Sequence, residues 1–225
     1  MYLIGNIFTL QKLIHAIRKI AFAQKHFQLT FVSKILDMKL NKNVIISLVL
    51  LIVIAAIYRV IPSRPFGFAP QIAMSLFGGA LFVKDKKWAF ALPLLSMFIS
   101  DALYQVLYVN GLTTIRGFYS GQITNYLLFA GLVVIGFAVK TNKIISIIGG
   151  VIAAPTAYFL ASNFLVWISG GGYHHPKTFT GMIACYVDAL PFYLNSLMAT
   201  AVFATVLFGA YNLVKKGEEK TALAA

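Results

Sequence analysis

Six apolar runs, separated and flanked by segments that carry most of the charged residues, constrain this chain more than any other feature. A run of about 20 apolar residues spans a bilayer, and in lipid the backbone must satisfy its hydrogen bonds within the segment, as a helix does. Only 11% of the residues are charged, against about 25% in soluble domains. The pattern predicts an all-α, polytopic membrane protein with six transmembrane helices, over residues 44–61, 70–83, 88–108, 122–139, 144–168 and 188–214.

Basic residues divide unequally between the two sides that six spans create. Nine lysines fall on one side: Lys39, Lys42, Lys84, Lys86, Lys87, Lys140, Lys143, Lys215 and Lys216. Four basic residues fall on the other: Arg59, Arg64, Arg116 and Lys177. The positive-inside rule places the lysine-rich side and both termini in the cytoplasm, which predicts a protein of the inner (cytoplasmic) membrane whose first partner is the lipid bilayer. Topology thus accounts for the net charge of +13 without a nucleic-acid partner.

Residues 1–37 precede the first predicted span and have two interpretations. Apolar residues recur at helical spacing from Leu3 to Ala21, which favours a basic amphipathic helix on the inner leaflet. Alternatively, "MKLNKN" at Met38 is the natural start of the protein, and the preceding residues come from a mis-assigned start codon. The predicted organisation is this extension, a six-helix membrane domain over residues 38–216, and a short cytoplasmic tail over residues 217–225.

Polar and charged residues gather toward the outer ends of the predicted spans. Asp101 is the deepest acidic residue, about 10 Å from the outer end of its helix at 1.5 Å per residue. A carboxylate at membrane depth is costly, and it usually faces a cavity or a partner. We expect the charged Asp101 to pair with Arg59 or Arg64 from the outer side and to line the ligand cavity. The predicted substrate-binding residues are Arg59, Arg64, Asp101, Asn163, Trp167, Tyr173, Asp188 and Asn195.

Several of these residues also have purely structural interpretations. Asp188 can cap the last span, and Trp167 and Tyr173 can belong to an interfacial aromatic belt. The adjacent histidines His174 and His175 do not face one way on a helix and lack further ligands at metal spacing, so no metal and no cofactor are predicted. Cys185 forms no evident nucleophile–base set with them, so no enzyme is predicted.

A series of motifs from Ile57 to Gly209 resembles a family of uncharacterised bacterial six-helix membrane proteins: "RPFGFAP", "SLFGGALF", "LPLLSMFISD", "SNFLVWISGGGY", "TGMIACY" and "ALPFYLNSLMAT…VLFG". That family is similar in architecture to the substrate-binding S components of energy-coupling factor (ECF) vitamin transporters. The resemblance implies an S-component-like bundle with cytoplasmic termini and a pocket near the outer surface. One feature departs from it: many S components carry an Ala-x-x-x-Ala motif in the first span, whereas this chain has only Ala55 and Ala56 there.

Two functions remain open at this point. The first is a substrate-binding component of an uptake system, in which the polar residues above hold a small molecule. No G-x-x-x-x-G-K-[ST] motif is present, so an ATP-driven step would need energising transporter subunits as partners. The alternative is a non-transporting assembly or envelope protein, in which the same polar residues only stabilise the bundle.

The lysine bias yields a direct test of orientation. A cytoplasmic reporter fused after Ala225 is expected to be active, and a periplasmic reporter at the same position is expected to be inactive, because positive loops stay inside. Activity of the periplasmic reporter would reverse the predicted topology.

Overall fold

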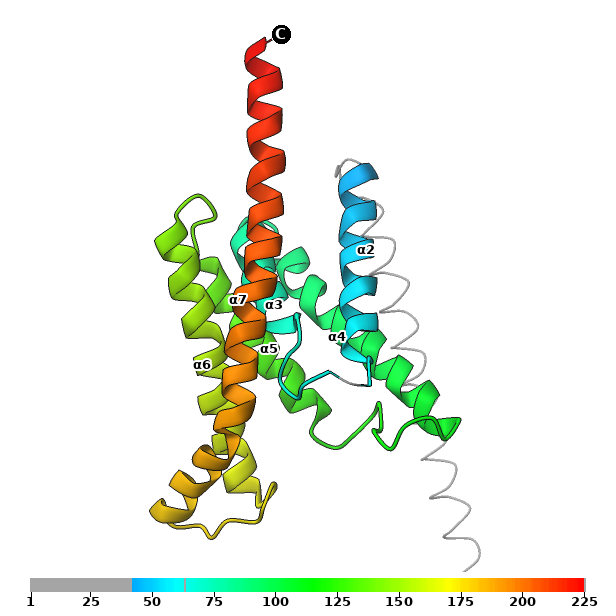
Figure 1. Cartoon of the computed structure of the whole chain (residues 1–225), viewed down its shortest axis with the longest axis vertical. Helices are drawn as coiled ribbons and strands as arrows, with labels where there is room; N and C mark the ends of the chain where they lie inside the picture. The colour runs from blue at the N-terminus through cyan, green and yellow to red at the C-terminus, as the bar shows by residue number, and fades with distance from the viewer. Residues whose placement is uncertain (1–41, 63, 225) are drawn as a thin grey trace, which may run out of the picture. The chain divides into compact units, whose positions relative to one another are not determined.

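The computed structural model describes residues 42–62 and 64–224 of the chain. That part contains six helices: α2 (Lys42–Arg59), α3 (Gln71–Leu81), α4 (Lys86–Val109), α5 (Gln122–Phe137), α6 (Ile144–Ser169) and α7 (Phe179–Ala224) (Figure 1). The chain divides into two compact units, Met1–Ile46 and Ser47–Ala225, and all packing discussed below lies within the second. The predicted extension over residues 1–37 lies outside the described residues.

The apolar runs predicted the helices well. Each of the six predicted ranges overlaps one helix, which confirms the all-α fold class for the described residues. Three helices are long and apolar enough to cross a membrane, namely α4, α6 and the Phe179–Val214 part of α7. The other apolar helices are shorter, over Leu48–Arg59, α3 and α5.

The last helix differs from its prediction at both ends. It begins at Phe179 rather than near Asp188, and it continues to Ala224 through most of the predicted tail. Thr178 explains the early start, because its Oγ1 accepts a hydrogen bond from the Gly181 backbone N–H at 3.1 Å, as an N-cap side chain does. The interpretation of Asp188 as the cap of this helix is therefore wrong, since Asp188 lies more than two turns inside it.

The short helix α3 forms the centre of the bundle. Every residue from Gln71 to Ala80 is buried, and the helix contacts α4, α5, α6 and α7. Eleven residues extend about 16 Å at 1.5 Å per residue, roughly half the hydrocarbon thickness of a bilayer. Because its whole circumference is covered by other helices, α3 behaves as a core element (Figure 1).

Glycines allow α3 and α5 to approach at backbone distance. A Cβ added at Gly136 would lie 2.6 Å from the Leu76 carbonyl oxygen and 2.9 Å from the Gly79 Cα. A Cβ added at Gly79 would collide in turn with the Val133 carbonyl oxygen. Small residues at such crossings are typical of helices that associate in membranes, where close backbone packing replaces a hydrophobic driving force.

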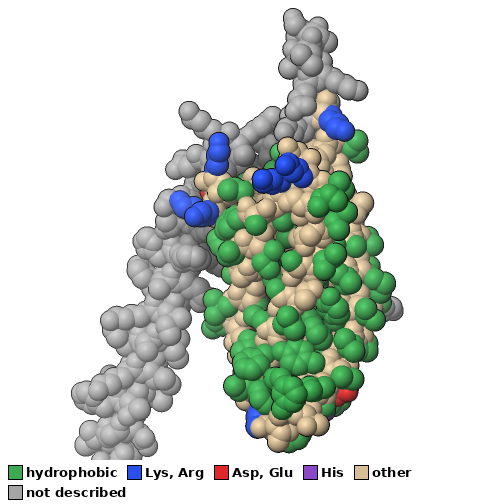
Figure 2. All heavy atoms as spheres, turned by 90° about the vertical axis from the view of Figure 1, so that its left-hand side faces the viewer, with side chains coloured by type: hydrophobic (Ala, Val, Ile, Leu, Met, Phe, Trp, Pro, Cys, Tyr) green, Lys and Arg blue, Asp and Glu red, His purple; other side chains and the backbone are tan. Residues whose placement is uncertain are grey.

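The exterior of the helices is apolar. Large aliphatic side chains on four helices are more than half exposed: Ile54, Val106, Ile123, Leu127 and Ile145. Figure 2 shows one such face, covered by hydrophobic side chains below a group of lysines and arginines. An apolar surface of this extent needs a nonaqueous environment, which is compatible with a membrane location.

The two ends of the helices carry different charges. Figure 1 places the α3–α4 and α5–α6 connections at one end and the α4–α5 and α6–α7 connections at the other. The first two connections, with the adjoining first turn of α4, carry Lys84, Lys86, Lys87, Lys140 and Lys143. The other two carry Arg116 and Lys177 as their basic residues. The predicted lysine bias thus appears as a difference between the ends, whereas the end that faces the cytoplasm stays a prediction.

The α3–α5 crossing provides a stability test. Gly136→Ala is expected to lower the free energy of unfolding by about 1–3 kcal/mol, because the new methyl group overpacks backbone atoms that cannot move aside. Gly131→Ala is the matched control on the same helix, since a Cβ there meets nothing within 4 Å. Thermal unfolding of the purified variants in detergent measures both effects, and equal melting temperatures would contradict the crossing.

Candidate functional site

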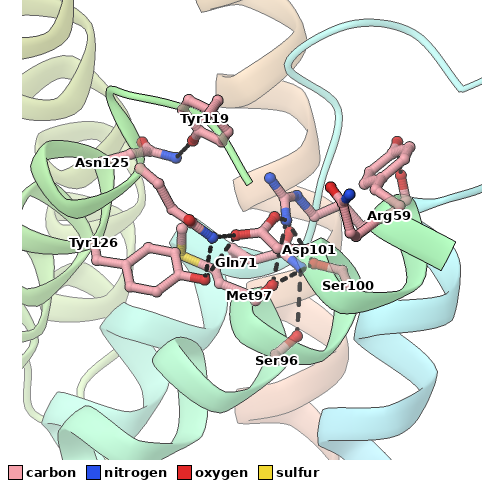
Figure 3. A network of polar contacts seen from close by, with 12 residues as sticks. Arg59, Gln71, Ser96, Met97, Ser100, Asp101, Tyr119, Asn125 and Tyr126 are labelled. Carbon is pink, nitrogen blue, oxygen red and sulfur yellow. Dashed lines mark hydrogen bonds and ion pairs between the residues drawn. The ribbon is translucent and has the colours of Figure 1, made fainter. Parts of the chain in front are cut away.

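The buried carboxylate of Asp101 joins three helices. Asp101 lies on α4 and is 1% exposed. Its Oδ1 forms an ion pair with Arg59 Nη1 at the end of α2. Its Oδ2 accepts hydrogen bonds from Gln122 Nε2 at 2.8 Å and from Tyr126 Oη at 2.7 Å, both on α5 (Figure 3). Both carboxylate oxygens are therefore satisfied by donors, an arrangement that stabilises the anion.

Arg59 is held by more than its ion pair. Its Nη1 also donates to Ser100 Oγ at 2.5 Å and to the Met97 carbonyl oxygen at 3.4 Å. The Tyr104 hydroxyl donates to the Arg59 carbonyl oxygen at 2.7 Å, and the guanidinium carbon lies 5.9 Å from the centre of the Tyr104 ring. These contacts confirm the predicted pairing of Asp101 with an arginine and identify the arginine as Arg59.

Arg64 organises the connection that follows α2. Its Nη1 donates to the Phe68 carbonyl oxygen at 2.8 Å, and its Nε donates to the Arg59 carbonyl oxygen at 3.3 Å. The same Arg59 carbonyl thus receives bonds from Arg64 and from Tyr104. The position of this connection therefore depends on where Arg59 is held.

Helix α7 anchors the same connection from the other side. Asn195 Nδ2 donates to the Phe66 carbonyl oxygen at 2.9 Å, and Ser196 Oγ donates to the Gly67 carbonyl oxygen at 3.1 Å. Gly67 has φ of +83°, and a Cβ there would lie 2.6 Å from the Phe192 carbonyl oxygen. Both the left-handed backbone and the close approach to α7 require glycine at this position.

A cavity of about 160 Å³ lies beside these groups. Its lining comes from α2, α3, α4, α5, α6, α7 and the connection after α2: Arg59, Arg64, Gly67, Ala69, Gln71, Ile72, Met97, Asn125, Phe129, Tyr158 and Ser196. Asp101 itself is absent from the lining and acts on the cavity through Arg59. A cavity of about 150 Å³ is large enough to hold benzene, so this one fits a small and compact molecule.

A second and larger recess lies between α5 and α6. Its volume is about 580 Å³, and Asn125 and Tyr158 line both spaces. The Tyr158 hydroxyl donates to Asn125 Oδ1 at 2.7 Å, and Asn125 Nδ2 donates to Tyr119 Oη at 3.1 Å. Burial is the main cause that raises the pKa of the Tyr119 hydroxyl. This chain of hydrogen bonds forms the boundary between the recess and the cavity.

The other predicted site residues form a separate group around the α6–α7 connection. Trp167 Nε1 donates to the Pro176 carbonyl oxygen at 3.0 Å, and His175 Nε2 lies 2.8 Å from Asp188 Oδ2. Tyr173 is 77% exposed. Asn163 Nδ2 donates to the Phe159 carbonyl oxygen of its own helix at 2.8 Å. Of the eight predicted residues, the structure therefore brings together Arg59, Arg64, Asp101 and Asn195, and only Arg59 and Arg64 line the cavity.

Metal ligands are not clustered in the part of the chain that the structure describes. No group of three or more His, Cys, Asp or Glu side chains there could hold a metal ion. The His175–Asp188 pair supplies two ligands at most.

Three residues of α5 belong to the site without carrying a charge that marks them in the sequence: Gln122, Asn125 and Tyr126. Their spacing of i, i+3 and i+4 places them on one face of a helix. A polar face in an apolar run is the signal by which they could have been found. Tyr158 and Gln71 are each followed at i+4 only by a serine, Ser162 and Ser75, which is a weaker signal.

The ion pair predicts a large effect of neutralising Asp101. Asp101→Asn is expected to lower the free energy of unfolding by about 3–5 kcal/mol, because the Arg59 charge is left without its partner. Asp85→Asn is the control, since Asp85 precedes α4 and makes no side-chain capping bond. The double variant Asp101→Asn, Arg59→Gln is expected to recover part of the loss in denaturant unfolding of the purified proteins. Wild-type stability of Asp101→Asn would mean that the pair does not hold the helices together.

Comparisons with known proteins give a family and no function. No curated protein and no solved structure matches the chain. The family model of DUF6580, described as a family of unknown function, matches residues 39–222, and the chain therefore belongs to this family.

Proposed function

We propose that this protein binds a small molecule in the cavity beside Arg59 and Arg64, as the substrate-binding component of an uptake system. One observation carries the proposal: the cavity of about 160 Å³ is lined by two arginines and by polar groups from several helices. Small-molecule sites are concave and mostly apolar, with a few convergent polar groups that orient the ligand. The apolar side chains of Ile72, Met97 and Phe129 complete that description.

The proposed topology has six spans, with both termini in the cytoplasm. The apolar exterior and the concentration of lysines at one end support it. Arg59 ends α2 and Arg64 follows it, so the cavity lies toward the end opposite the lysine-rich connections. In this orientation the cavity would open toward the outer side of the membrane, where an uptake protein meets its substrate.

An ECF-like arrangement would need partner subunits. The chain has no nucleotide-binding P-loop motif, so energy would come from separate ATPase and coupling proteins. Ala55 and Ala56, at the place where S components carry their docking motif, are 3% and 0% exposed. Because they are covered by this chain itself, a coupling subunit would have to dock on a different surface.

The alternative is a non-transporting membrane protein in which the buried network is structural. It is favoured by the fact that both oxygens of Asp101 are satisfied within the chain. Co-purification separates the two functions: ATPase subunits recovered with the gently extracted protein support uptake, and their consistent absence supports the alternative.

Native mass spectrometry tests the cavity directly. The gently extracted wild-type protein is expected to carry a small molecule that leaves on collisional activation. Ala69→Phe is expected to abolish that adduct, because the ring fills part of the cavity. Ala138→Phe is the control, since Ala138 is exposed at the end of α5 and lines neither space. An adduct that persists in Ala69→Phe would place the ligand elsewhere.

A further inference from the structure

We infer that the cavity is built for a small monocarboxylic acid that also carries a hydroxyl group as a hydrogen-bond donor. The inference rests on the proposed binding function and names the class of ligand. Three features of the lining support it: an unbalanced positive charge, unused guanidinium donors and an unpaired buried acceptor.

The charge at the cavity is positive by one unit. Asp101 neutralises Arg59, whereas the bonds of Arg64 to the described part of the chain go only to backbone carbonyl oxygens. Among the described residues that line the cavity, none is acidic. A single uncompensated guanidinium in a partly buried site favours a ligand with one negative charge over a neutral molecule or a dianion.

Both arginines have donors left for such an anion. Among the described residues, no hydrogen-bond partner is found for Nη2 of Arg59 or for Nη2 of Arg64. Both side chains line the cavity. A carboxylate accepts hydrogen bonds at two oxygens and matches the planar donors of guanidinium groups. It can therefore accept hydrogen bonds from the remaining donors of both arginines.

Gln71 is the reason to expect a hydrogen-bond donor on the ligand. Its Nε2 donates to the Ala55 carbonyl oxygen and to Ser96 Oγ, each at 3.4 Å (Figure 3). The bond to the Ala55 carbonyl fixes the amide orientation, because only the nitrogen can donate. The other atom, Oε1, is buried without a partner in the structure, and Gln71 lines the cavity. A ligand that brings an O–H group to this end of the Gln71 side chain would supply the hydrogen bond that Oε1 lacks.

Size and apolar contacts limit the rest of the ligand. The volume of about 160 Å³ fits a molecule of about the size of benzene with its polar groups at the rim. Ile72, Met97 and Phe129 present the apolar wall, and Phe129 lies against Tyr158 with ring centres 5.0 Å apart. A small hydroxy acid with a compact apolar part therefore matches the arginines, Gln71 and the apolar wall of the cavity.

Matched compounds test the class on the purified full chain. Thermal unfolding is measured with 4-hydroxybenzoate, with 4-hydroxybenzamide, which lacks the charge, and with benzoate, which lacks the donor. Lactate and lactamide form a smaller matched pair. Because a ligand that binds only the folded state raises its stability by mass action, the melting temperature reports binding. At least one hydroxy acid is expected to bind about tenfold or more tightly than its neutral amide, and 4-hydroxybenzoate is expected to bind more tightly than benzoate.

Variants of Arg64 and Gln71 test whether these two residues cause the preferences for the acid and for the hydroxyl group. Arg64→Gln is expected to remove the preference for the acid over the amide, whereas Arg116→Gln leaves it unchanged, because Arg116 is exposed and outside the lining. Gln71→Met has a similar length without polar atoms, and it is expected to remove the preference for 4-hydroxybenzoate over benzoate. The comparison of compounds on the wild-type protein stands even where a variant fails to fold.

The outcomes separate the ligand class from the proposed function. Equal or tighter binding of the amides overturns the class and leaves a binding function intact. No response to any of the acids at millimolar concentration also overturns the class, and the adduct in native mass spectrometry then decides whether the cavity binds another molecule. An absence of both responses and adducts overturns the class and the binding function together.

Discussion

The pair formed by Asp101 and Arg59 is the interaction on which the rest of the site depends. A carboxylate buried to 1% exposure is stable as an anion only when donors surround it, and here they come from α2 and α5. The pair fixes the end of α2, and the Arg59 carbonyl oxygen then accepts bonds from Tyr104 and Arg64. The Asp101 carboxylate thus positions the wall of the cavity through Arg59, although Asp101 itself does not line the cavity.

The sequence was sufficient to predict the helices and the pairing of Asp101 with an arginine, either Arg59 or Arg64, for related physical reasons. An apolar run of membrane length leaves a helix as the only way to satisfy the backbone. An isolated acid at depth requires a cation at the same height, and Arg59 ends the neighbouring span at that height. The beginning of α7 was harder to predict, because it depends on one hydroxyl bond from Thr178 in a polar segment without apolar periodicity.

The composition of the candidate site was predictable only in part. Position along a span gives the height of a residue, but the side of the bundle on which it lies depends on how the helices pack. Asp188 and Asp101 were therefore placed in one cluster, whereas Asp188 contacts His175 at the α6–α7 connection and Asp101 contacts Arg59. The uncharged Gln122 and Tyr126 make two of the three side-chain interactions of Asp101, and residue charge gives no indication of them.

Gln71 connects the rigid core with the cavity. It is the first residue of α3, which is covered on all sides by other helices. Its amide therefore has little freedom to turn toward another partner. A buried acceptor without a hydrogen bond costs about 1–3 kcal/mol of stability. The glycine-mediated packing of α3 against α5 holds the helix in place despite that cost. A donor from a bound acid would supply the missing bond to Gln71, and the rigid position of its amide would make the site selective for ligands that carry such a donor.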